Sequence, residues 1–577
     1  MITINRFPKK MDQYPVDKTN LRKCLVSGLF EEQIEINGCL RCFYTYLTPG
    51  LEYDSKCLVV VPPADIDIQE YLQNSPWISF AETKKIFLHI LKSADGTWSY
   101  DGSDADFMNK VYMKIQARDY YVTMQDNIYA IGVGDGATVA QQAIMKMTSE
   151  WAGMATFGNL DDAAILCEKN TNDVDSKEDM GRVELAIYAQ KAQIPVWMVW
   201  PEKNSANTRI MDYWKEQNDV AGEKYASGFA DEIYLPNPVY KKSSVNDENI
   251  SQVRITNGWK QNLSEDMITE VWSYISQCCR HRCFTQKALR RFKNPVDFGA
   301  EYRTIEVDGY TRCWFEYIPK HLKESRINIP MVITMHGRGG SAESFFDLSG
   351  LSCVAEERDF IAVFPESGIY QQKPGGLKNV LAWNGSYDGK SIDDVKFIKA
   401  MIEDIKKRYS VDTHRIYACG QSSGGMMTAE LAVRAPEIFA AVSPWSALRD
   451  PDKKTYVPKS IHPKVPFLFL LGENDWLCVD KKDGKLEYKV TDPIAEYLQN
   501  LMLIYKLETK PHTYQCGEIT YYVYPDAQKV PMLIVGTVKD MSHANYPRES
   551  WIAYDEFFSK FVKEDDGTLK YMGEKVL

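Results

Sequence analysis

The sequence lacks several features that would assign it to a specialised class of protein. Its 577 residues carry a net charge of −11, which argues against an extended surface for nucleic-acid phosphates. No apolar run is long enough for a membrane-spanning helix, and the N-terminus lacks the apolar centre of a signal peptide. The 13 cysteines are odd in number and scattered, without a disulfide framework. We therefore expect a cytoplasmic globular protein that binds neither nucleic acid nor a membrane.

Two segments repeat one pattern, in which an apolar strand enters a glycine-rich turn and then a helix. The late turn is Gly420-Gln421-Ser422-Ser423-Gly424, with the G-x-S-x-G spacing of a nucleophile elbow. The early turn is Gly132-Val133-Gly134-Asp135-Gly136, with glycine at the serine position. A serine hydroxyl can attack an acyl carbon, whereas glycine has no nucleophile. We expect the second half to carry chemistry that the first half has lost.

Two further pairs of segments indicate a duplicated chain. Residues 36–47 and 307–318 each begin with an Asx-Gly turn and continue as an aromatic-rich strand. Residues 194–200 and 465–471 are matching buried-strand runs. The stretch between the Asx-Gly turn and the elbow is longer in the second half, and these extra residues are expected to shape a substrate pocket.

Apolar strands alternate with helical segments in both halves. This pattern predicts an α/β protein with two tandem domains, each a mostly parallel sheet with helices on both faces. The basic stretch at 280–294 is the expected boundary. It separates a degenerate domain at 1–285 from a catalytic domain at 286–577.

An activated serine needs a histidine base, and in this arrangement the order along the chain is Ser, then Asp or Glu, then His. Three histidines follow Ser422. His462 precedes the strand that leads to the acid, and His512 lies before further strands. His543 follows the last apolar strand and precedes the final helix, so we predict that His543 is the base.

The acid is expected just after a buried strand. Asp475 follows the 465–471 strand and a glycine, whereas its nearest competitor, Asp480, lies in a polar loop with two lysines. The predicted catalytic residues are therefore Ser422, Asp475 and His543. In the first half the corresponding positions hold Gly134 and Asn204, and neither His89 nor His281 stands where a base would.

An oxyanion hole needs two convergent backbone amides. We predict the amides of Ser423, directly after the nucleophile, and of Arg338, in the glycine-rich loop at 336–341. His336 is expected to brace this loop through hydrogen bonds. The equivalent early segment at 60–64 has no His-Gly pair and contains two prolines, which have no amide hydrogen to donate.

Three tryptophans adjoin the carboxyl ends of predicted strands, where such folds bind ligands. Trp383, Trp445 and Trp476 are candidates for a pocket that accepts aromatic groups, with a place in the core as the alternative. The cysteine-rich run at 278–283 matches no zinc spacing, and two arginines interrupt it. We expect no metal and no organic cofactor.

Several motifs, in order, resemble the polyhydroxybutyrate depolymerase and feruloyl esterase group of α/β-hydrolases, similar to carbohydrate esterase family 1. They are residues 336–345, Phe364-Pro365-Glu366, Trp383-Asn384, 393–398 and 409–417. The resemblance covers most of residues 300–560. It implies an α/β-hydrolase fold and serine esterase chemistry, and it supports Ser422, Asp475 and His543 as the triad.

The chain departs from this group in three respects. Arg338 replaces the cysteine often found after His-Gly, and Met541-Ser542-His543 replaces Gly-Met-Gly-His. The whole first half is additional, as a degenerate hydrolase-like domain that could be a folding partner, a surface for homo-oligomers or a wall of the active site. These departures bear on the substrate, not on the class of reaction.

The expected function is a serine ester hydrolase that cleaves small soluble carboxylic esters through an acyl-enzyme. The acyl group is hydroxycinnamoyl, hydroxyalkanoyl or a short chain. Two alternatives remain open. The same triad could serve a serine peptidase or an acyltransferase, or the chain could be a non-catalytic binding or scaffold protein.

Overall fold

The structure, a computed structural model, describes most of the chain. The described residues are 2–8, 14–53, 55–115, 127–165, 192–237, 250–280, 289–325, 327–371, 379–384, 392–448, 460–477, 488 and 490–576. His281, Asp480 and the centre of the predicted domain boundary lie outside the described residues.

The described residues of the first half form one sheet of eleven strands. Its strands in spatial order are β1 (Ile4–Asn5), β2 (Gly28–Ile36), β3 (Cys39–Leu47), β5 (Phe87–Leu91), β4 (Cys57–Val61), β6 (Ile128–Val133), β7 (Gly153–Phe157), β8 (Val196–Val199), β11 (Val253–Thr256), β10 (Ala230–Pro236) and β9 (Val220–Ser227). The run from β5 to β11 is parallel. The β2–β3 hairpin and the β10–β9 edge are antiparallel.

The second half forms a sheet of ten strands among its described residues. Their order is β14 (Glu301–Val307), β15 (Tyr310–Tyr317), β17 (Ile361–Pro365), β16 (Ile329–Met335), β20 (Val411–Gln421), β21 (Ala441–Trp445), β22 (Phe467–Gly472), β25 (Leu533–Val538), β24 (Ile519–Tyr524) and β23 (His512–Cys516). The run from β17 to β25 is parallel, and both edges are antiparallel.

Apart from β1, the two sheets have the same strand order. Each begins with an antiparallel hairpin. The next two strands stand in the sheet in the reverse of their order along the chain, and parallel strands follow. The last three strands again stand in reverse order of sequence. This is the topology of the α/β-hydrolase fold, so the predicted fold class is confirmed. The division into domains at 1–285 and 286–577 stays a prediction.

The two hairpin turns show why the sequence repeats there. Asn37 and Gly38 have φ of 50° and 80°, and Asp308 and Gly309 have φ of 53° and 76°. Two consecutive positive φ values define a type I′ turn, which matches the twist of the flanking strands and favours Asx-Gly. The predicted hairpins at these two places are confirmed.

Helices cover both faces of the first sheet, because its strands are apolar on both sides. Along β4, Val59 and Val61 join one apolar cluster, and Leu58 and Val60 join the other. The first cluster contains residues of α3 (Ser103–Ile115), α4 (Gly136–Lys146) and α5 (Ser205–Gln217). The second contains residues of α1 (Ile68–Asn74), α2 (Trp77–Lys84) and α6 (Glu265–Ile275). This layering is the one predicted from the alternating pattern.

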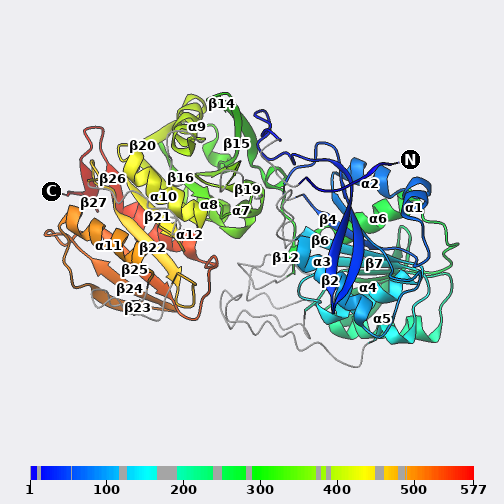
Figure 1. Cartoon of the computed structure of the whole chain (residues 1–577). Helices are drawn as coiled ribbons and strands as arrows, with labels where there is room; N and C mark the ends of the chain where they lie inside the picture. The colour runs from blue at the N-terminus through cyan, green and yellow to red at the C-terminus, as the bar shows by residue number, and fades with distance from the viewer. Residues whose placement is uncertain are drawn as a thin grey trace.

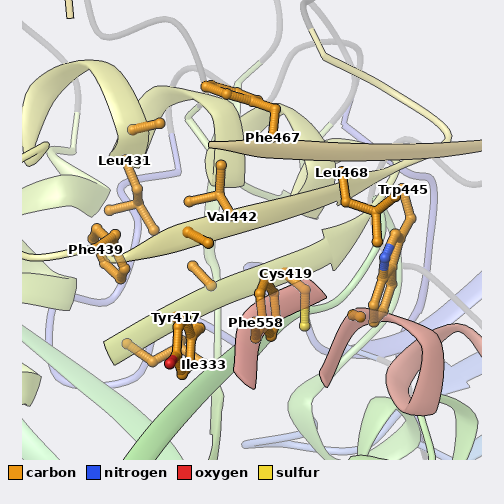
Figure 2. Packing of buried hydrophobic residues seen from close by; sticks show 14 of the residues in the cluster. Ile333, Tyr417, Cys419, Leu431, Phe439, Val442, Trp445, Phe467, Leu468 and Phe558 are labelled. Atoms are coloured by element: carbon orange, nitrogen blue, oxygen red, sulfur yellow. The ribbon is translucent and has the colours of Figure 1, made fainter. Parts of the chain in front are cut away.

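The second half has its own core around β16, β20 and β21. Tyr417 of β20 stacks on Phe558, with ring centroids 4.9 Å apart, and Trp445 lies buried at the end of β21 (Figure 2). The helices of this half are α7 (Ala342–Leu348), α8 (Leu351–Arg358), α9 (Asp394–Arg408), α10 (Ser423–Arg434), α11 (Asp492–Tyr505) and α12 (Glu549–Trp551). The predicted last helix continues from α12 as one π turn, Ile552–Phe557, and a 3-10 turn, Phe558–Lys560.

Among the described residues, three small sheets complete the fold. They are β12 (Cys278–Arg280) with β13 (Leu289–Arg291), β18 (Gly368–Gln371) with β19 (Asn379–Ala382), and β26 (Phe561–Lys563) with β27 (Leu569–Tyr571) and β28 (Glu574–Lys575). The β18–β19 hairpin lies between the Asx-Gly turn and the elbow of the second half, where the sequence carries extra residues. Figure 1 shows the two large sheets side by side, with the described residues just before β2 lying close to β15.

Candidate active site

Ser422 stands at a sharp turn between β20 and α10. Its backbone has φ 55° and ψ −116°, a strained conformation for a residue with a side chain. Its N–H donates to the carbonyl oxygen of Trp445 at 2.9 Å, which fixes the turn to the neighbouring strand. A Cβ at Gly424 would lie 2.0 Å from the carbonyl oxygen of Met335, so only glycine fits there. The elbow therefore presents Ser422 at the carboxyl edge of the sheet.

The structure brings Ser422, His543 and Asp475 into one hydrogen-bonded chain. The distance from His543 Nε2 to Ser422 Oγ is 2.9 Å. The two carboxylate oxygens of Asp475 lie 3.0 and 2.8 Å from His543 Nδ1. Because a carboxylate only accepts, Nδ1 carries a proton, and Nε2 of the neutral ring is free to accept the serine proton.

Backbone hydrogen bonds fix the position of the acid relative to the base. The N–H of Leu477 donates to Asp475 Oδ1 at 2.9 Å, and Asp475 is only 1% exposed. The N–H of Asn474 donates to the carbonyl oxygen of Met541 at 2.8 Å. This bond links the loop after β22 to the loop after β25, so the two strands, which are neighbours in the sheet, carry Asp475 and His543 to one place.

Glu549 supports the histidine loop, and the sequence analysis missed it. Its buried carboxyl accepts hydrogen bonds from the side-chain amide of Asn545 and from the N–H of Tyr546, the latter at 3.1 Å. Burial raises the pKa of Glu549 to about 8, although both hydrogen bonds lower it. The sequence did offer a signal for this contact, because Asn545 and Glu549 are four residues apart at the start of the last helix.

The predicted oxyanion loop lies against the elbow. A Cβ at Gly337 would be 2.4 Å from Gln421 Oε1, so the loop and the end of β20 are in close contact. The N–H of Gly339 donates to the carbonyl oxygen of Leu381 at 2.7 Å. Arg338 lies between these two glycines with an exposed side chain, and Ser423 begins α10 on the other side of Ser422.

His336 braces this loop, as the sequence predicts. Its Nδ1 donates to the carbonyl oxygen of Gly337 at 2.7 Å, and its Nε2 lies 2.9 Å from Glu366 Oε1. Burial raises the pKa of Glu366, but attraction to His336 and to Arg22 outweighs it and holds that pKa below its usual value. The sequence analysis gave no role to Glu366 or Arg22.

Two of the three predicted pocket tryptophans are core residues, which corrects that prediction. Trp383 is buried, and its Nε1–H donates to the carbonyl oxygen of His336 at 3.0 Å. Trp445 is also buried, with its Nε1–H on Ser443 Oγ at 2.9 Å (Figure 2). Neither indole has the exposed surface that contact with a substrate would need. Trp476 is 60% exposed, and its ring centroid lies 5.2 Å from that of His543.

The first half keeps the shape of the elbow without its chemistry. Gly134 has φ 62°, and its N–H donates to the carbonyl oxygen of Phe157 at 2.7 Å, the counterpart of the bond made by Ser422. The N–H of Ala64, where an oxyanion amide would be expected, donates to Asp135 Oδ1 at 3.0 Å. A carboxylate of the chain itself therefore occupies a donor that a hydrolase would aim at its substrate.

The other first-half positions have structural roles. Asn204 caps α5 by accepting the N–H of Asn207 at 2.7 Å. His89 is buried on β5, with its Nδ1 2.9 Å from Thr45 Oγ1. No described residue of this half forms the serine, histidine and carboxylate chain found at Ser422.

No group of three or more His, Cys, Asp and Glu side chains in the described part of the chain is arranged to hold a metal ion. Within the same residues, no helix has the length and apolar character needed to cross a membrane.

Comparisons with known proteins point to esterases. Residues 315–451 match the family model described as Esterase PHB depolymerase. Feruloyl esterase B of Thermothelomyces thermophilus is 30% identical over 132 residues, which are 23% of this chain and 43% of that protein. Poly(3-hydroxyalkanoate) depolymerase C of Paucimonas lemoignei is 28% identical over 131 residues, 22% of this chain and 30% of that protein.

One solved structure is similar over part of the chain. The acetyl xylan esterase from Aspergillus awamori aligns with a TM-score of 0.32 and 14% identity, over 45% of this chain and 99% of that chain. The chain spans less than two thirds of the length of the curated relatives it matches. Ser422 lies inside the matched segment, whereas Asp475 and His543 lie beyond it. Within residues 315–451 the chain thus resembles the esterases of the PHB depolymerase family, which confirms the resemblance indicated by its motifs.

Proposed function

We propose that this protein is a serine ester hydrolase, with Ser422 as nucleophile, His543 as general base and acid, and Asp475 as the group that orients His543. The observation that carries the proposal is the unbroken hydrogen-bonded chain from Asp475 through His543 to Ser422, at 2.8 and 2.9 Å. The strained backbone of Ser422, at the carboxyl edge of a parallel sheet, adds support.

The reaction proceeds in two halves. Ser422 Oγ attacks the acyl carbon of the ester while His543 Nε2 takes its proton, and the carbonyl oxygen becomes an oxyanion. The amides of Ser423 and Arg338 stabilise that charge. His543 then gives its proton to the leaving alcohol, and an acyl group remains on Ser422. Water attacks this acyl-enzyme by the same route and releases the acid.

The substrate class follows from the matched family and from Trp476. The similar proteins are named as a feruloyl esterase and a poly(3-hydroxyalkanoate) depolymerase. We propose that this chain cleaves small soluble esters of hydroxycinnamic, hydroxyalkanoic or short-chain acids. An exposed indole beside His543 gives an aromatic acyl group a flat apolar surface.

The proposed setting is the cytoplasm. Cys39, Cys353 and Cys516 carry exposed thiols that form no disulfide. Free thiols suit a reducing compartment. A homo-oligomer formed through the first half is a further proposal, and size-exclusion chromatography with light scattering tests it.

The test is turnover of a panel of nitrophenyl esters and methyl hydroxycinnamates by the wild type, Ser422→Ala and Ser559→Ala. The last variant removes an exposed hydroxyl far along the same half and controls for the substitution itself. We expect turnover by the wild type and Ser559→Ala, and none by Ser422→Ala. Labelling of Ser422 by a fluorophosphonate should follow the same pattern.

Other outcomes separate the alternatives. Cleavage of amides in preference to esters would identify a peptidase, and transfer of the acyl group to an added alcohol would identify an acyltransferase. If no ester is cleaved and no label attaches to Ser422, the catalytic proposal fails and a binding or scaffold role replaces it.

A further inference from the structure

A short segment of the first half, before β2, contacts the second half close to the residues that hold the oxyanion loop. The N–H of Thr311, in β15, donates to the carbonyl oxygen of Lys18 at 2.8 Å. Leu21 is buried, and its Cδ1 would lie 3.2 Å from a Cβ built on Gly368 at the start of β18. This segment therefore packs on the second half, next to the strand end that precedes the β18–β19 hairpin.

Arg22 is anchored in the first half. Its carbonyl oxygen accepts the N–H of Tyr53 at 2.7 Å, and its Nη1 lies 3.8 Å from Glu52 Oε2. Asn20, two residues earlier, donates from its side-chain amide to Glu52 at 2.7 Å. The guanidinium is thus carried on backbone that belongs to the first sheet and its loops.

The same guanidinium faces Glu366 of the second half. Arg22 Nε lies 3.8 Å from Glu366 Oε2, and the side chains are only 14% and 3% exposed. Water and salt screen such a pair little, so the charges interact more strongly than a surface pair would. A buried carboxylate needs compensating charge and hydrogen bonds. Arg22 supplies part of that compensation across the interface.

Glu366 in turn holds both ends of the oxyanion loop. Its Oε1 lies 2.9 Å from His336 Nε2, at the start of the loop. Its Oε2 accepts the N–H of Ala342 at 3.0 Å, at the end of the loop. The amide of Arg338 lies between these two attachment points, so its direction depends on where Glu366 sits.

A second contact reaches the same loop from the β18–β19 hairpin. The carbonyl oxygen of Leu381 accepts the N–H of Gly339 at 2.7 Å. The buried side chain of Leu381 belongs to an apolar cluster whose other members all come from the first half, Leu51 and Tyr53 among them. The first half therefore contacts the supports of the loop on two sides.

We propose that Arg22 is a positioning residue for the oxyanion loop at 336–341, acting through Glu366, and that the first half is thereby part of the catalytic apparatus of the second. The inference rests on the proposed function for its kinetic consequences. It assigns the first half the role of aligning a backbone amide, without any contact to the substrate.

The test compares Arg22→Met, Arg22→Lys and Lys18→Ala in the full chain. Lys18 supplies a matched control, because its ammonium lies over the Tyr310 ring at 5.3 Å in the same interface. Loss of a whole oxyanion donor lowers kcat by about 10²–10³, so a displaced loop should lower it by about 10- to 100-fold. We expect this fall in Arg22→Met with KM within about twofold, because ground-state binding does not use the oxyanion amides.

Two further measurements distinguish positioning from general destabilisation. Arg22→Lys keeps the charge and should retain most of kcat, and Lys18→Ala should match the wild type. Adding Arg22→Met to Glu366→Gln should lower kcat no further than Glu366→Gln alone, because both changes act on one contact. If Arg22→Met does not fold, Arg22→Gln replaces it.

Hydrogen exchange keeps this proposal separate from the proposed function. Amides of residues 336–342 should exchange faster in Arg22→Met than in the wild type, and equally in Lys18→Ala. An enzyme without ester turnover would defeat the proposed function, yet the exchange result would still decide the positioning role. Unchanged kcat and unchanged exchange in a folded Arg22→Met would overturn the inference.

Discussion

Replacing Asp475 by asparagine tests the geometry of the site most directly. Asp475 Oδ1 lies 2.9 Å from the N–H of Leu477 and 3.0 Å from His543 Nδ1, and Oδ2 lies 2.8 Å from Nδ1. An asparagine keeps the shape of the side chain but replaces one oxygen with an NH₂ group. The Leu477 N–H needs an acceptor, so the amide oxygen should take the Oδ1 position and the NH₂ group should face His543.

That orientation moves the N–H proton of the neutral imidazole from Nδ1 to Nε2. An NH₂ group donates to Nδ1, so Nδ1 loses its hydrogen and Nε2 carries it. A protonated Nε2 cannot accept the proton of Ser422, which lies 2.9 Å away. The flipped amide would restore the useful tautomer, but it would set the NH₂ group against the buried N–H of Leu477, at a cost of about 1–3 kcal/mol.

We therefore expect Asp475→Asn to lower kcat about 10⁴-fold, the size known for the wrong tautomer in such triads, which is about 5.5 kcal/mol in the barrier. The assay is turnover of a saturating nitrophenyl ester, with melting temperatures to establish that the variant folds. Asn474→Ala, which alters an exposed neighbouring side chain, should behave as the wild type. A folded Asp475→Asn within about tenfold of wild-type kcat would refute this reasoning, because the acid would not then control the tautomer.

Three further predictions concern residues around the triad. Trp383→Phe removes the donor to the carbonyl oxygen of His336, and steady-state kinetics should show kcat about 10-fold lower with KM unchanged, as for one displaced oxyanion donor. Trp476→Ala should raise KM for methyl hydroxycinnamates more than for nitrophenyl acetate, and equal changes would contradict an aromatic contact. Since burial raises the pKa of Glu549 from 4.5 to about 8, the native carboxyl keeps a proton that the unfolded chain releases. Its contribution to the free energy of unfolding should fall as pH rises between these values, and denaturant titrations of Glu549→Gln should lack that slope.

The fold was predictable because the turns between its strands and helices are specified by residues adjacent in sequence. Asn37-Gly38 and Asp308-Gly309 specify two-residue turns, and the two elbows at Gly134 and Ser422 specify strand-turn-helix units, each by residues adjacent in sequence. The order of the strands then follows from the α/β-hydrolase fold that the motifs imply. Serine, acid and histidine could be placed because each follows a recognisable strand end.

The direction of side chains near those strand ends could not be predicted in the same way. Trp383, Trp445 and Trp476 all adjoin the carboxyl edge of the sheet, yet only Trp476 is exposed. Successive side chains of an extended segment point to opposite sides. A shift of one position therefore moves a side chain from the pocket to the core. A tryptophan in a short irregular segment gives no periodicity from which to choose.

Contacts between the halves were beyond sequence reasoning for a different reason. Arg22 and Glu366 are far apart in the chain, and each stands in a segment without a motif of its own that predicts a partner. The local pattern of Phe364-Pro365-Glu366 supports a resemblance to esterases, but it does not say that a first-half arginine lies beside the glutamate. Only the contact between the two halves brings these charges together.

Both halves have the geometry of an elbow turn, but only the described residues of the second half form the hydrogen-bonded chain of serine, histidine and aspartate. The first half has an elbow at Gly134, with glycine at the serine position and Asn204 at the acid position, and Asp135 accepts the N–H of Ala64. Restoring one residue there could not restore hydrolysis, because each remaining defect alone blocks proton transfer or oxyanion binding. Under the proposed positioning role, the first half influences catalysis through the contact of Arg22 with Glu366, the carboxylate that holds the loop of the second half.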